Sequence, residues 1–452
     1  MKTVGIIAEY NPFHNGHAFQ LEEVRRAFGA DAAVVVAMSG DFTQRGEPAI
    51  ADKWVRAESA LRSGVDLVLE IPFAYAAASA ERFAFGGVSL LAATGVCGRL
   101  AFGSESGSLD ALRPLADVLV REPEGYRNLL RDRLDEGLSF PAARQAALAE
   151  YLTNEGLPGD AALLEKPNDI LGVEYLKAVH RLGDRAPAPF AVRRTGAGYH
   201  DAEVPAAGDA GRTVIASASA LRAAFLAPLA PRTPGSSAVD RDGLGAAFES
   251  IRRACPPASC GALLEAASRG IAPVAPEALA PLLLSMLRSL PVDRLDRIAY
   301  MGEGLSRRLK AAAAEVDGGR AHAGSAAGLY ASLTARAATR RFPSTRIARA
   351  LAALAVGLTD EDLALFDAAG GPRYLRVLGF TKKGRYLLKR MRTSATLPLV
   401  TKASDFLEHG DDPALQRMAA LDLAAADLHR LSAPDPACRR CGLDFDTPVV
   451  ML

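Results

Sequence analysis

In the first 230 residues, short apolar runs alternate with stretches in which apolar residues recur at helical spacing. Such runs are typical of strands buried on both faces, and helices between them imply a parallel sheet. The stretches 17–28 and 169–182 are predicted to be helices. The predicted strands are residues 2–8, 32–38, 66–71, 99–103 and 189–195. The pattern therefore predicts an α/β domain over residues 1–230.

The pattern changes at residues 227–243, where Pro, Gly and Ser gather as they do in linkers. Beyond this segment, Ala, Leu and Arg recur at helical spacing. The predicted helices are residues 277–290, 303–316, 326–341 and 343–358. Residues 244–452 are therefore predicted to form a second domain that is mainly α-helical.

Composition narrows the class of protein. The 452 residues are 49% hydrophobic and 23% charged, as in soluble globular proteins, which excludes collagen-like and wholly disordered chains. No apolar run reaches the roughly 18 residues of a membrane span, and the N-terminus lacks the layout of a secretory signal. We therefore expect a cytoplasmic protein with no membrane partner.

The five cysteines, Cys97 included, argue by their odd and sparse number against a disulfide framework. Cys438 and Cys441 form one CxxC pair, whereas a structural zinc site needs four ligands. Cys255 and Cys260 are a second pair, but their spacing fits poorly. We expect reduced thiols and no bound metal.

Charge is uneven along the chain. Lys and Arg total 53 against 52 acidic residues, yet residues 336–392 hold thirteen basic and four acidic residues, a local charge of +9. Such a concentration is typical of a surface that meets a phosphate backbone, although solvated helix faces also carry it. The interleaved Tyr374, Phe380 and Tyr386 fit either a core or stacking on an unpaired base. The candidate nucleic-acid contacts are Arg346, Arg376, Lys382, Lys383 and Arg385.

The segment most indicative of chemistry is residues 9–17, EYNPFHNGH. It places His14 and His17 between the first strand and the first helix, at the edge of an α/β sheet where ligands bind. The helix start favours an anion, and Gly16 lets a ligand approach the backbone closely. Two imidazoles there would stabilise the charge that grows during attack on an α-phosphate. Metal ligation and an ordinary turn are the alternatives, but no third metal ligand is nearby.

A second segment, residues 215–222 (IASASALR), has hydroxyls and a guanidinium suited to the β and γ phosphates of a leaving pyrophosphate. A capped helix start with a solvent-exposed Arg is the alternative. Together, HxGH and this ISSTxIR-like string resemble the nucleotidyltransferase superfamily of class I aminoacyl-tRNA synthetases and cofactor adenylyltransferases. The resemblance implies a Rossmann-like HxGH nucleotidyltransferase domain with a parallel sheet, in which the catalytic candidates are His14, His17 and Arg222.

Longer strings narrow the resemblance. MSGDFTQRGEPAIADKWVRAE, VDLVLEIPF, KPNDILGVEY, RRTGAGYHD and YLRVLGFTKKG resemble the bacterial tRNA(Met) cytidine acetate ligase family, and the match runs from residue 4 to about residue 402. The resemblance implies an enzyme that makes acetyl-adenylate from ATP and acetate. It then acetylates N4 of the wobble cytidine of elongator tRNA(Met), forming N4-acetylcytidine. Mg²⁺ is implied only as the partner of ATP.

The resemblance also implies the residues that bind ATP. Gly103 would allow the nucleotide to approach the backbone closely. The amide of Asn168 would contact the ribose or the edge of adenine; the alternative is that Asn168 is a helix N-cap. Of the strand-end pair Arg193 and Arg194, we prefer Arg194 as the phosphate ligand. The expected ATP-binding residues are Ile7, Ala8, Glu9, Tyr10, Asn11, Pro12, Phe13, His14, Asn15, Gly16, His17, Ala18, Phe19, Gln20, Gly103, Asn168, Arg193, Arg194, Ser217 and Ser219.

Residues 39–53 follow the second strand at the same edge of the sheet. We expect Arg45 or Lys53 to contact acetate or the tRNA backbone; a surface loop held by salt bridges is the alternative. Two other functions stay open. A cofactor-type adenylyltransferase is one, although the long basic helical half argues against it. A non-catalytic tRNA-binding protein is the other, although the intact HxGH motif argues against it.

Overall fold

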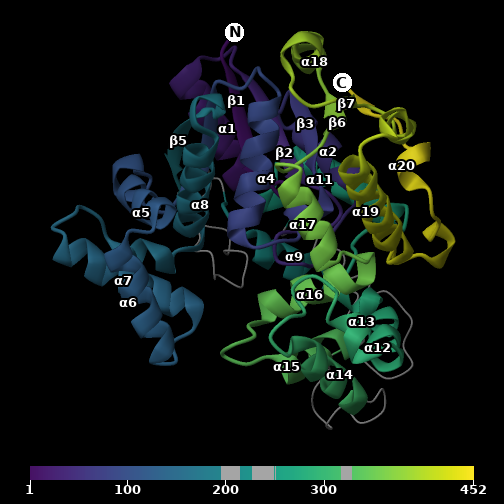
Figure 1. Ribbon diagram of the computed structural model, residues 1–452. Coiled ribbons are helices and arrows are strands. Elements are labelled where there is room, and N and C mark those ends of the chain that lie inside the picture. Colours follow the sequence, from purple (N-terminus) through teal and green to yellow (C-terminus); the bar gives the residue numbers. More distant parts are fainter. Residues whose placement is uncertain (195–213, 227–248, 250, 317–327) are drawn as a thin grey trace.

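The computed structural model describes residues 1–194, 214–226, 249, 251–316 and 328–452. The predicted linker at 227–243 and residues 195–201 of one family-like string lie outside this described part. Figure 1 shows a central sheet with helices on both faces and two helical lobes below it. One lobe comes from α5–α7 and the other from α12–α16.

The sheet has the strand order β5-β4-β1-β2-β3-β6-β7, with β8 paired to β6. The five strands predicted from the sequence are all present and parallel. They are β1 (Thr3–Ala8), β2 (Ala33–Ser39), β3 (Leu67–Ile71), β4 (Arg99–Ser104) and β5 (Ala188–Arg193).

Three strands of the second half were not predicted. β6 (Leu375–Phe380) pairs antiparallel with β3, while β7 (Leu399–Val400) and β8 (Val450–Met451) pair with β6. The parallel strands were predicted from the alternation of strands and helices, but an antiparallel strand at the edge of such a sheet does not need that alternation. β6 was therefore not recognised among the helical segments that surround it. The prediction that this half is mainly α-helical is confirmed, and three of its strands in addition extend the sheet of the first half.

The helices of the first half connect the parallel strands. Successive strand residues face opposite sides of the sheet. Thus Val34 and Val36 pack with α1 and α2, while Val35 and Ala37 pack in the core that contains α4 and α8. These helices are α1 (Asn15–Phe28), α2 (Lys53–Arg62), α3 (Phe73–Ala76), α4 (Ala80–Ala93), α5 (Leu109–Arg121), α6 (Glu124–Asp135), α7 (Phe140–Asn154) and α8 (Pro167–Leu182).

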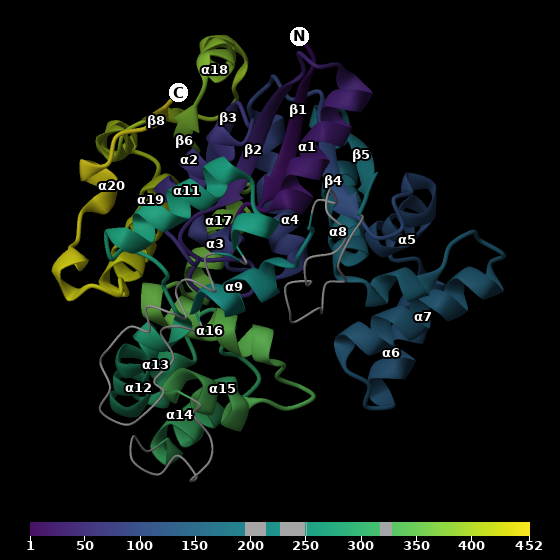
Figure 2. The same ribbon diagram turned by 180° about the vertical axis from the view of Figure 1, so that it is seen from behind.

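The remaining helices cover the other end of the sheet and form the second lobe. They are α9 (Ala218–Leu226), α11 (Pro257–Ser268), α12 (Ala280–Ser289), α13 (Val292–Leu295), α14 (Leu305–Glu315), α15 (Leu329–Ala337), α16 (Ser344–Val356), α17 (Asp360–Ala368), α18 (Lys382–Ser394), α19 (Pro413–Leu431) and α20 (Leu443–Asp446). Figure 2 shows α11 and α9 on the side of the sheet that carries α1 and α2.

The strand order creates the place for a ligand. The chain moves from β1 to β2 to β3 in one direction, then returns to place β4 on the other side of β1. The loops that leave β1 and β4 therefore diverge at their carboxyl ends, where open α/β sheets bind ligands.

Candidate active site

A cavity of about 180 Å³ lies at this divergence between β1 and β4. Its walls come from the loop after β1, the loop after β2, the end of β4 and the starts of α8 and α9. Fourteen of the expected ATP-binding and catalytic residues line it: Ile7, Ala8, Glu9, Tyr10, Asn11, His14, His17, Gln20, Gly103, Asn168, Arg194, Ser217, Ser219 and Arg222. Segments more than 200 residues apart in the sequence thus meet at one site.

His14 and His17 form a stacked pair at the start of α1. Their ring centroids are 3.8 Å apart, with an interplanar angle of 23°. The N–H of Gly16 donates to Nδ1 of His14 at 3.0 Å, and the N–H of His14 donates to Nδ1 of His17 at 3.2 Å. Each Nδ1 is therefore an acceptor, so in the neutral imidazole the proton sits on Nε2.

Burial and nearby cations keep both imidazoles neutral. Burial, helped by Arg194 and Arg222, lowers the pKa of His14 to about 3. Burial, together with His14 and Arg194, holds the pKa of His17 well below its usual range. The pair therefore presents two fixed Nε2–H donors at neutral pH, and neither donor requires a proton from solvent.

Gly16 is required by the histidine pair itself. A Cβ at this position would lie 2.9 Å from Cε1 of the His14 ring, closer than such atoms approach. The ring is held there by the N–H of Gly16, so a larger residue would displace the hydrogen bond that sets the tautomer. This steric role adds to the close ligand approach inferred from the sequence.

The buried side chain of Arg56 holds the loops after β1 and β2. It donates to the main-chain oxygens of Glu9 at 2.7 Å, Ser39 at 3.1 Å and Ala51 at 2.9 Å, and also to that of Gly40. Four carbonyls are thereby fixed around one guanidinium. Sequence reasoning missed this residue because nothing in its local pattern separates it from a solvent-exposed helical Arg.

The second motif completes the cavity from α9. Ser217 accepts a hydrogen bond from the N–H of Ala220 at 3.0 Å, as a helix-capping hydroxyl does. Arg222 donates from Nη1 to the main-chain oxygen of Asn11 at 3.0 Å and from Nη2 to Ser219 at 3.2 Å. The capped helix start proposed as an alternative is thus real, but Arg222 faces the cavity instead of bulk solvent.

Gly103 on β4 and Arg194 just after the paired strand β5 also line the cavity. The N–H of Arg194 donates to the oxygen of Ser104 at 2.9 Å, and its Cγ lies 3.3 Å from where a Cβ of Gly103 would be. Alternation along the strand turns the preceding Arg193 away, against Gly107, and Arg193 is not part of the cavity wall. The geometry therefore favours Arg194 over Arg193.

Asn168 lines the cavity without capping α8. The helix begins one residue earlier, at Pro167, and the carboxylate of Glu105 accepts from the N–H groups of Asn168 (3.3 Å) and Asp169 (2.8 Å). The side-chain amide of Asn168 also donates to Glu105 at 2.6 Å. The N-cap alternative is therefore wrong. The amide is held in place and its oxygen remains available to a ligand.

Six expected residues of the first loop and helix are not among the residues that line the cavity: Pro12, Phe13, Asn15, Gly16, Ala18 and Phe19. Asn15 has a structural role, because its amide donates to the oxygens of Val214 (2.8 Å) and Arg253 (3.0 Å). Conversely, the sequence did not reveal the wall residues Thr43, Phe83, Phe102, Leu171 and Tyr175. Apolar residues on predicted helices and strands carried no signal that set them apart from the core.

The loop after β2 divides into two parts. Gln44 and Arg45 line the cavity. Lys53, in contrast, is fully buried and bonded to Glu70 (2.9 Å) and Asp444 (2.6 Å), with Asp41 at 3.8 Å. The expectation that Lys53 contacts acetate or tRNA was therefore wrong, because three carboxylates hold its ammonium inside the protein.

The basic segment 336–392 is partly neutralised by acids outside it. Arg376 is buried, donates to the oxygen of Asp444 at 3.4 Å and lies over the rings of Trp54 and Phe406, so its prediction as a nucleic-acid contact was wrong. Tyr374 is likewise buried and hydrogen-bonded to Asp422, which excludes it from stacking on a base. Arg376 lies on β6 and Tyr374 comes just before it, in a part of the sheet that is buried on both faces.

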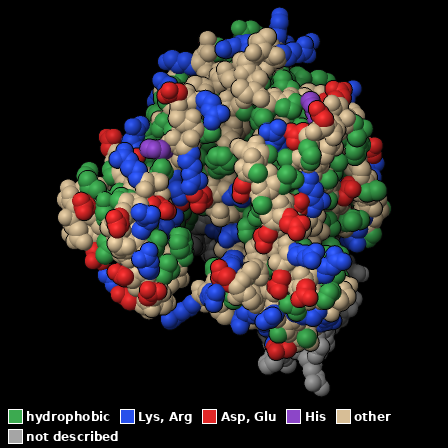
Figure 3. Space-filling view, in the orientation of Figure 1, with side chains coloured by type: hydrophobic (Ala, Val, Ile, Leu, Met, Phe, Trp, Pro, Cys, Tyr) green, Lys and Arg blue, Asp and Glu red, His purple; other side chains and the backbone are tan. Residues whose placement is uncertain are grey.

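The helix α18 keeps its positive charge exposed. In the part of the chain that the structure describes, Lys382, Lys383 and Arg385 make no ion pair, and Tyr386 is 55% exposed among them. Figure 3 shows basic side chains gathered over α18 at the top of the molecule. The N–H of Thr381 bonds to the oxygen of Asp66, just before β3, so α18 lies at the edge of the sheet opposite the cavity.

The cysteines form no metal centre within the described residues. Burial raises the pKa of Cys97 and that of Cys255 to about 12, as in unreactive core thiols. Cys438 donates to the oxygen of Arg269 at 3.1 Å. No helix of the described part is long and apolar enough to cross a membrane.

Comparison with known proteins defines the class. Residues 1–442 match the model of the HIGH Nucleotidyl Transferase family. The Rossmann-type sheet and the pair of histidines where the loops after β1 and β4 diverge agree with that family. The chain belongs to the HIGH Nucleotidyl Transferase family.

The match is closer still to one group of proteins. The chain is 37% identical to "tRNA(Met) cytidine acetate ligase" of Acetivibrio thermocellus over all of both chains, and 35% identical to that of Thermotoga maritima over 98% of this chain and 99% of the relative. The crystal structure of Thermotoga maritima TmcAL bound with alpha-thio ATP has a TM-score of 0.84 at 33% identity, with both chains fully covered. The chain is a member of the tRNA(Met) cytidine acetate ligase family.

Proposed function

We propose that this protein is an ATP-dependent ligase that activates acetate as acetyl-adenylate and acetylates N4 of the wobble cytidine of elongator tRNA(Met). The observation that carries the proposal is the pair of neutral imidazoles, His14 and His17, whose Nε2–H donors share one cavity with Arg194 and Arg222. Fixed donors beside two guanidiniums suit a polyphosphate whose α-phosphorus is attacked.

In the first step, an acetate oxygen forms a bond to the α-phosphorus of ATP, and the bond to the bridging oxygen of pyrophosphate breaks. We assign the Nε2–H groups of His14 and His17 to the α-phosphate oxygens, where charge grows. Arg222, with Ser217 and Ser219, holds the β and γ phosphates. Acetate needs no protein nucleophile, so the residues only position and stabilise.

In the second step, N4 of cytidine attacks the acetyl carbonyl carbon, AMP leaves with the bonding electrons, and N4 gives up a proton. An amino group of this kind is a weak nucleophile, which is why activation of acetate precedes it. The cavity walls from Phe83, Phe102 and Tyr175 exclude water and thereby protect the mixed anhydride.

For the rest of ATP, we assign Asn168 to the ribose or adenine edge and Gly103 to close contact with the nucleotide. Both line the cavity. Glu9 is the one carboxylate among the wall residues, and it accepts the N–H of Gln44 at 2.8 Å. Mg²⁺ would therefore be held mainly by the phosphate oxygens of ATP, whose charge it would offset.

For tRNA, we propose that Arg346 and the exposed helix α18 contact the phosphate backbone, through Lys382, Lys383 and Arg385. Because α18 lies across the sheet from the cavity, it would meet a part of the tRNA remote from the wobble base. A folded tRNA is long enough to reach both. A tRNA substrate also supports a cytoplasmic location for this protein.

The test is incubation of the purified protein with ATP, carbon-labelled acetate and total bacterial tRNA, followed by nucleoside mass analysis. Labelled N4-acetylcytidine is expected. Formation of AMP that depends on acetate, without label in tRNA, would support the activation of acetate and contradict tRNA as the acceptor of the acetyl group. No AMP with any acid tested would favour a cofactor adenylyltransferase, or a tRNA-binding protein without catalysis.

A further inference from the structure

A second and larger cavity lies away from the ATP cavity and shares no wall residue with it. Its volume is about 490 Å³. It is bounded by α2, by the turn at residues 269–271 and by the C-terminal segment 437–450. Its apolar floor consists of Trp54, Val55, Ile271, Leu443, Val449 and Val450.

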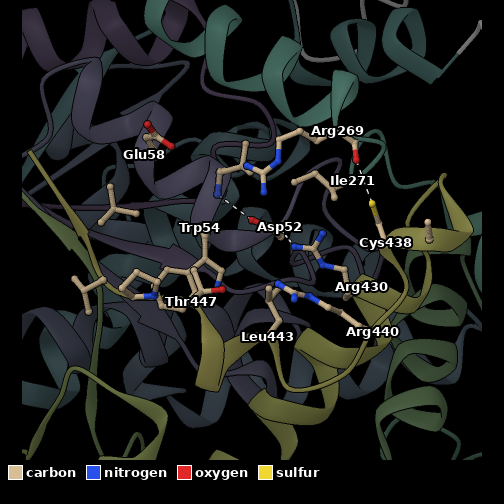
Figure 4. Close-up of a pocket in the computed structure, with 15 residues that line it drawn as sticks. Asp52, Trp54, Glu58, Arg269, Ile271, Arg430, Cys438, Arg440, Leu443 and Thr447 are labelled. Carbon is tan, nitrogen blue, oxygen red and sulfur yellow. Dashed lines mark hydrogen bonds and ion pairs between the residues drawn. The ribbon is translucent and has the colours of Figure 1, made fainter.

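Three guanidiniums surround this floor. Figure 4 shows Arg269, Arg430 and Arg440 extending toward the same side of the cavity, across from Trp54. Arg430 is 7% exposed and bonded through Nη2 to Asp52 at 3.0 Å. In the described chain, Arg440 makes no ion pair, and Arg269 reaches its only acid, Glu265, at 3.9 Å.

The acidic residues of this cavity are already engaged. Asp52 accepts from Arg430 and from the N–H of Val55, and Glu58 accepts from Arg62 at 2.8 Å. Two buried N–H groups of wall residues, Nε of Arg430 and Nε1 of Trp54, have no acceptor in the described part of the protein. The cavity therefore has donors and positive charge left over, whereas the two acidic residues among its described wall residues are already engaged.

Specific contacts hold the turn at residues 269–271 against the C-terminal segment of the cavity wall. The N–H of Asp435 donates to the oxygen of Gly270 at 3.0 Å, and Cys438 donates to the oxygen of Arg269. Gly270 has φ +70°, and a Cβ there would lie 2.4 Å from Cβ of Asp435. A glycine is thus needed for the two turns to meet. This contact also gives Cys438 of the CxxC pair a structural role.

We propose that this cavity is a second phosphate-binding site, which takes a phosphate group carried on a nucleotide. Guanidiniums recognise phosphate oxygens through paired N–H donors, and an apolar floor accepts the less polar face of a base or sugar. The phosphate belongs either to a free nucleotide or to an unpaired stretch of RNA. If it belongs to the RNA substrate, the inference rests on the proposed function; if to a free nucleotide, it stands alone.

The experiment titrates the full-length protein with cytidine 5′-monophosphate and, separately, with a short single-stranded RNA. Two variants alter the cavity: R269S/R440S removes exposed guanidiniums, and A437W fills the space by steric bulk. The variant R294S/R307S is the control, because it removes the same charge from exposed positions on α13 and α14. We expect both cavity variants to bind roughly tenfold more weakly or worse, and the control to bind as the parent does.

The two probes distinguish the sources of the phosphate. If the cavity variants bind both probes more weakly, the cavity binds the phosphate of any nucleotide. If they bind only the RNA more weakly, the cavity binds the phosphate of an RNA backbone. Affinities of the cavity variants within twofold of the control, for both probes, would overturn the proposal. Acetate-dependent exchange of pyrophosphate into ATP is measured in parallel and should not change. A parent protein without this exchange contradicts the proposed function and leaves the second site untouched.

Discussion

Arg222 donates from Nη1 to the main-chain oxygen of Asn11, 211 residues earlier in the chain, at 3.0 Å. This bond ties the second motif to the loop that carries the histidine pair. Because the second guanidinium nitrogen bonds to Ser219, the fork of Arg222 is oriented before any ligand arrives. Assembly of the site therefore depends on this side chain as well as on the phosphates it is proposed to hold.

We predict that Arg222→Lys lowers acetate-dependent ATP–pyrophosphate exchange by about 10²-fold, although the positive charge remains. Lysine cannot donate to Asn11 and Ser219 while also facing a phosphate. The measurement is exchange at saturating acetate, with thermal unfolding as the check on folding. An exchange rate within threefold of the parent would show that charge alone suffices.

Replacement of both histidines tests the electrostatic role of the pair. His14→Ala with His17→Ala should reduce exchange by about 10³-fold or more, because two fixed donors to the α-phosphate are lost together. Binding of tRNA should stay within about twofold, since the helix α18 lies at the opposite edge of the sheet. If the double variant still catalyses ATP–pyrophosphate exchange at the parent's rate, His14 and His17 do not stabilise the transition state.

The low pKa values of the pair predict how rate and stability depend on pH. His14 has a pKa of about 3 in the folded protein, against about 6.5 in an unfolded chain. The unfolded chain therefore binds more protons between these values, so this contribution to stability is complete above pH 6.5 and is lost as the pH falls toward 3.

Two measurements check this reasoning. Exchange should show no limb from these histidines between pH 5 and 8. The urea midpoint of His14→Asn should rise relative to that of the parent as the pH falls from 7.5 to 5, whereas that of the control His180→Asn, at a half-exposed position, should not. The comparison with the parent cancels the opposite pH dependence that the raised pKa of Glu70 gives to both proteins. A rate that titrates near pH 6.5 and loses this limb in His14→Asn would contradict a neutral pair.

The parallel strands, the first helix and the two motifs could be predicted because each has a local signature: an apolar run, a helical period or a residue string. The wall residues Phe83 and Tyr175 could not, since apolar side chains serve the core and the cavity alike. Lys53 and Arg376 were misplaced for a related reason. A charged side chain reveals its burial only through partners such as Asp444, which lie far away in the sequence.

The exposed charge of α18 predicts a salt-dependent contribution to tRNA binding. K382E/K383E/R385E should weaken tRNA binding and reduce the slope of log affinity against log salt by up to about three, roughly one for each lost phosphate contact. Filter binding at several salt concentrations measures both. The control R294E/R297E/R307E reverses as many exposed charges on the lobe formed by α12–α16. An equal slope in both variants would mean that α18 only faces solvent.

Lys53 forms a buried ion cluster with Asp41, Glu70 and Asp444. Removing the acid from Glu70 or from Asp444 should change the free energy of unfolding by different amounts. Burial alone lowers the pKa of Lys53, but Asp444, Glu70 and Asp41 raise it overall, so its ammonium stays charged. Burial, opposed by Lys53, raises the pKa of Glu70, so its ionised form is disfavoured and Glu70 is the weaker countercharge. Asp444 is thus the main countercharge, with its oxygen 2.6 Å from Nζ.

Asp444→Asn should therefore cost about 3–5 kcal/mol of unfolding free energy at pH 7, because it leaves the buried ammonium without that countercharge. Glu70→Gln should cost less, about 1 kcal/mol, since an amide of the same size replaces an acid whose ionisation burial already disfavours. Urea denaturation at pH 7 measures both, with Asp446→Asn on the same helix as the control for the substitution itself. Equal costs for the two buried changes would mean that Glu70 is ionised and shares the charge of Lys53, contrary to the raised pKa.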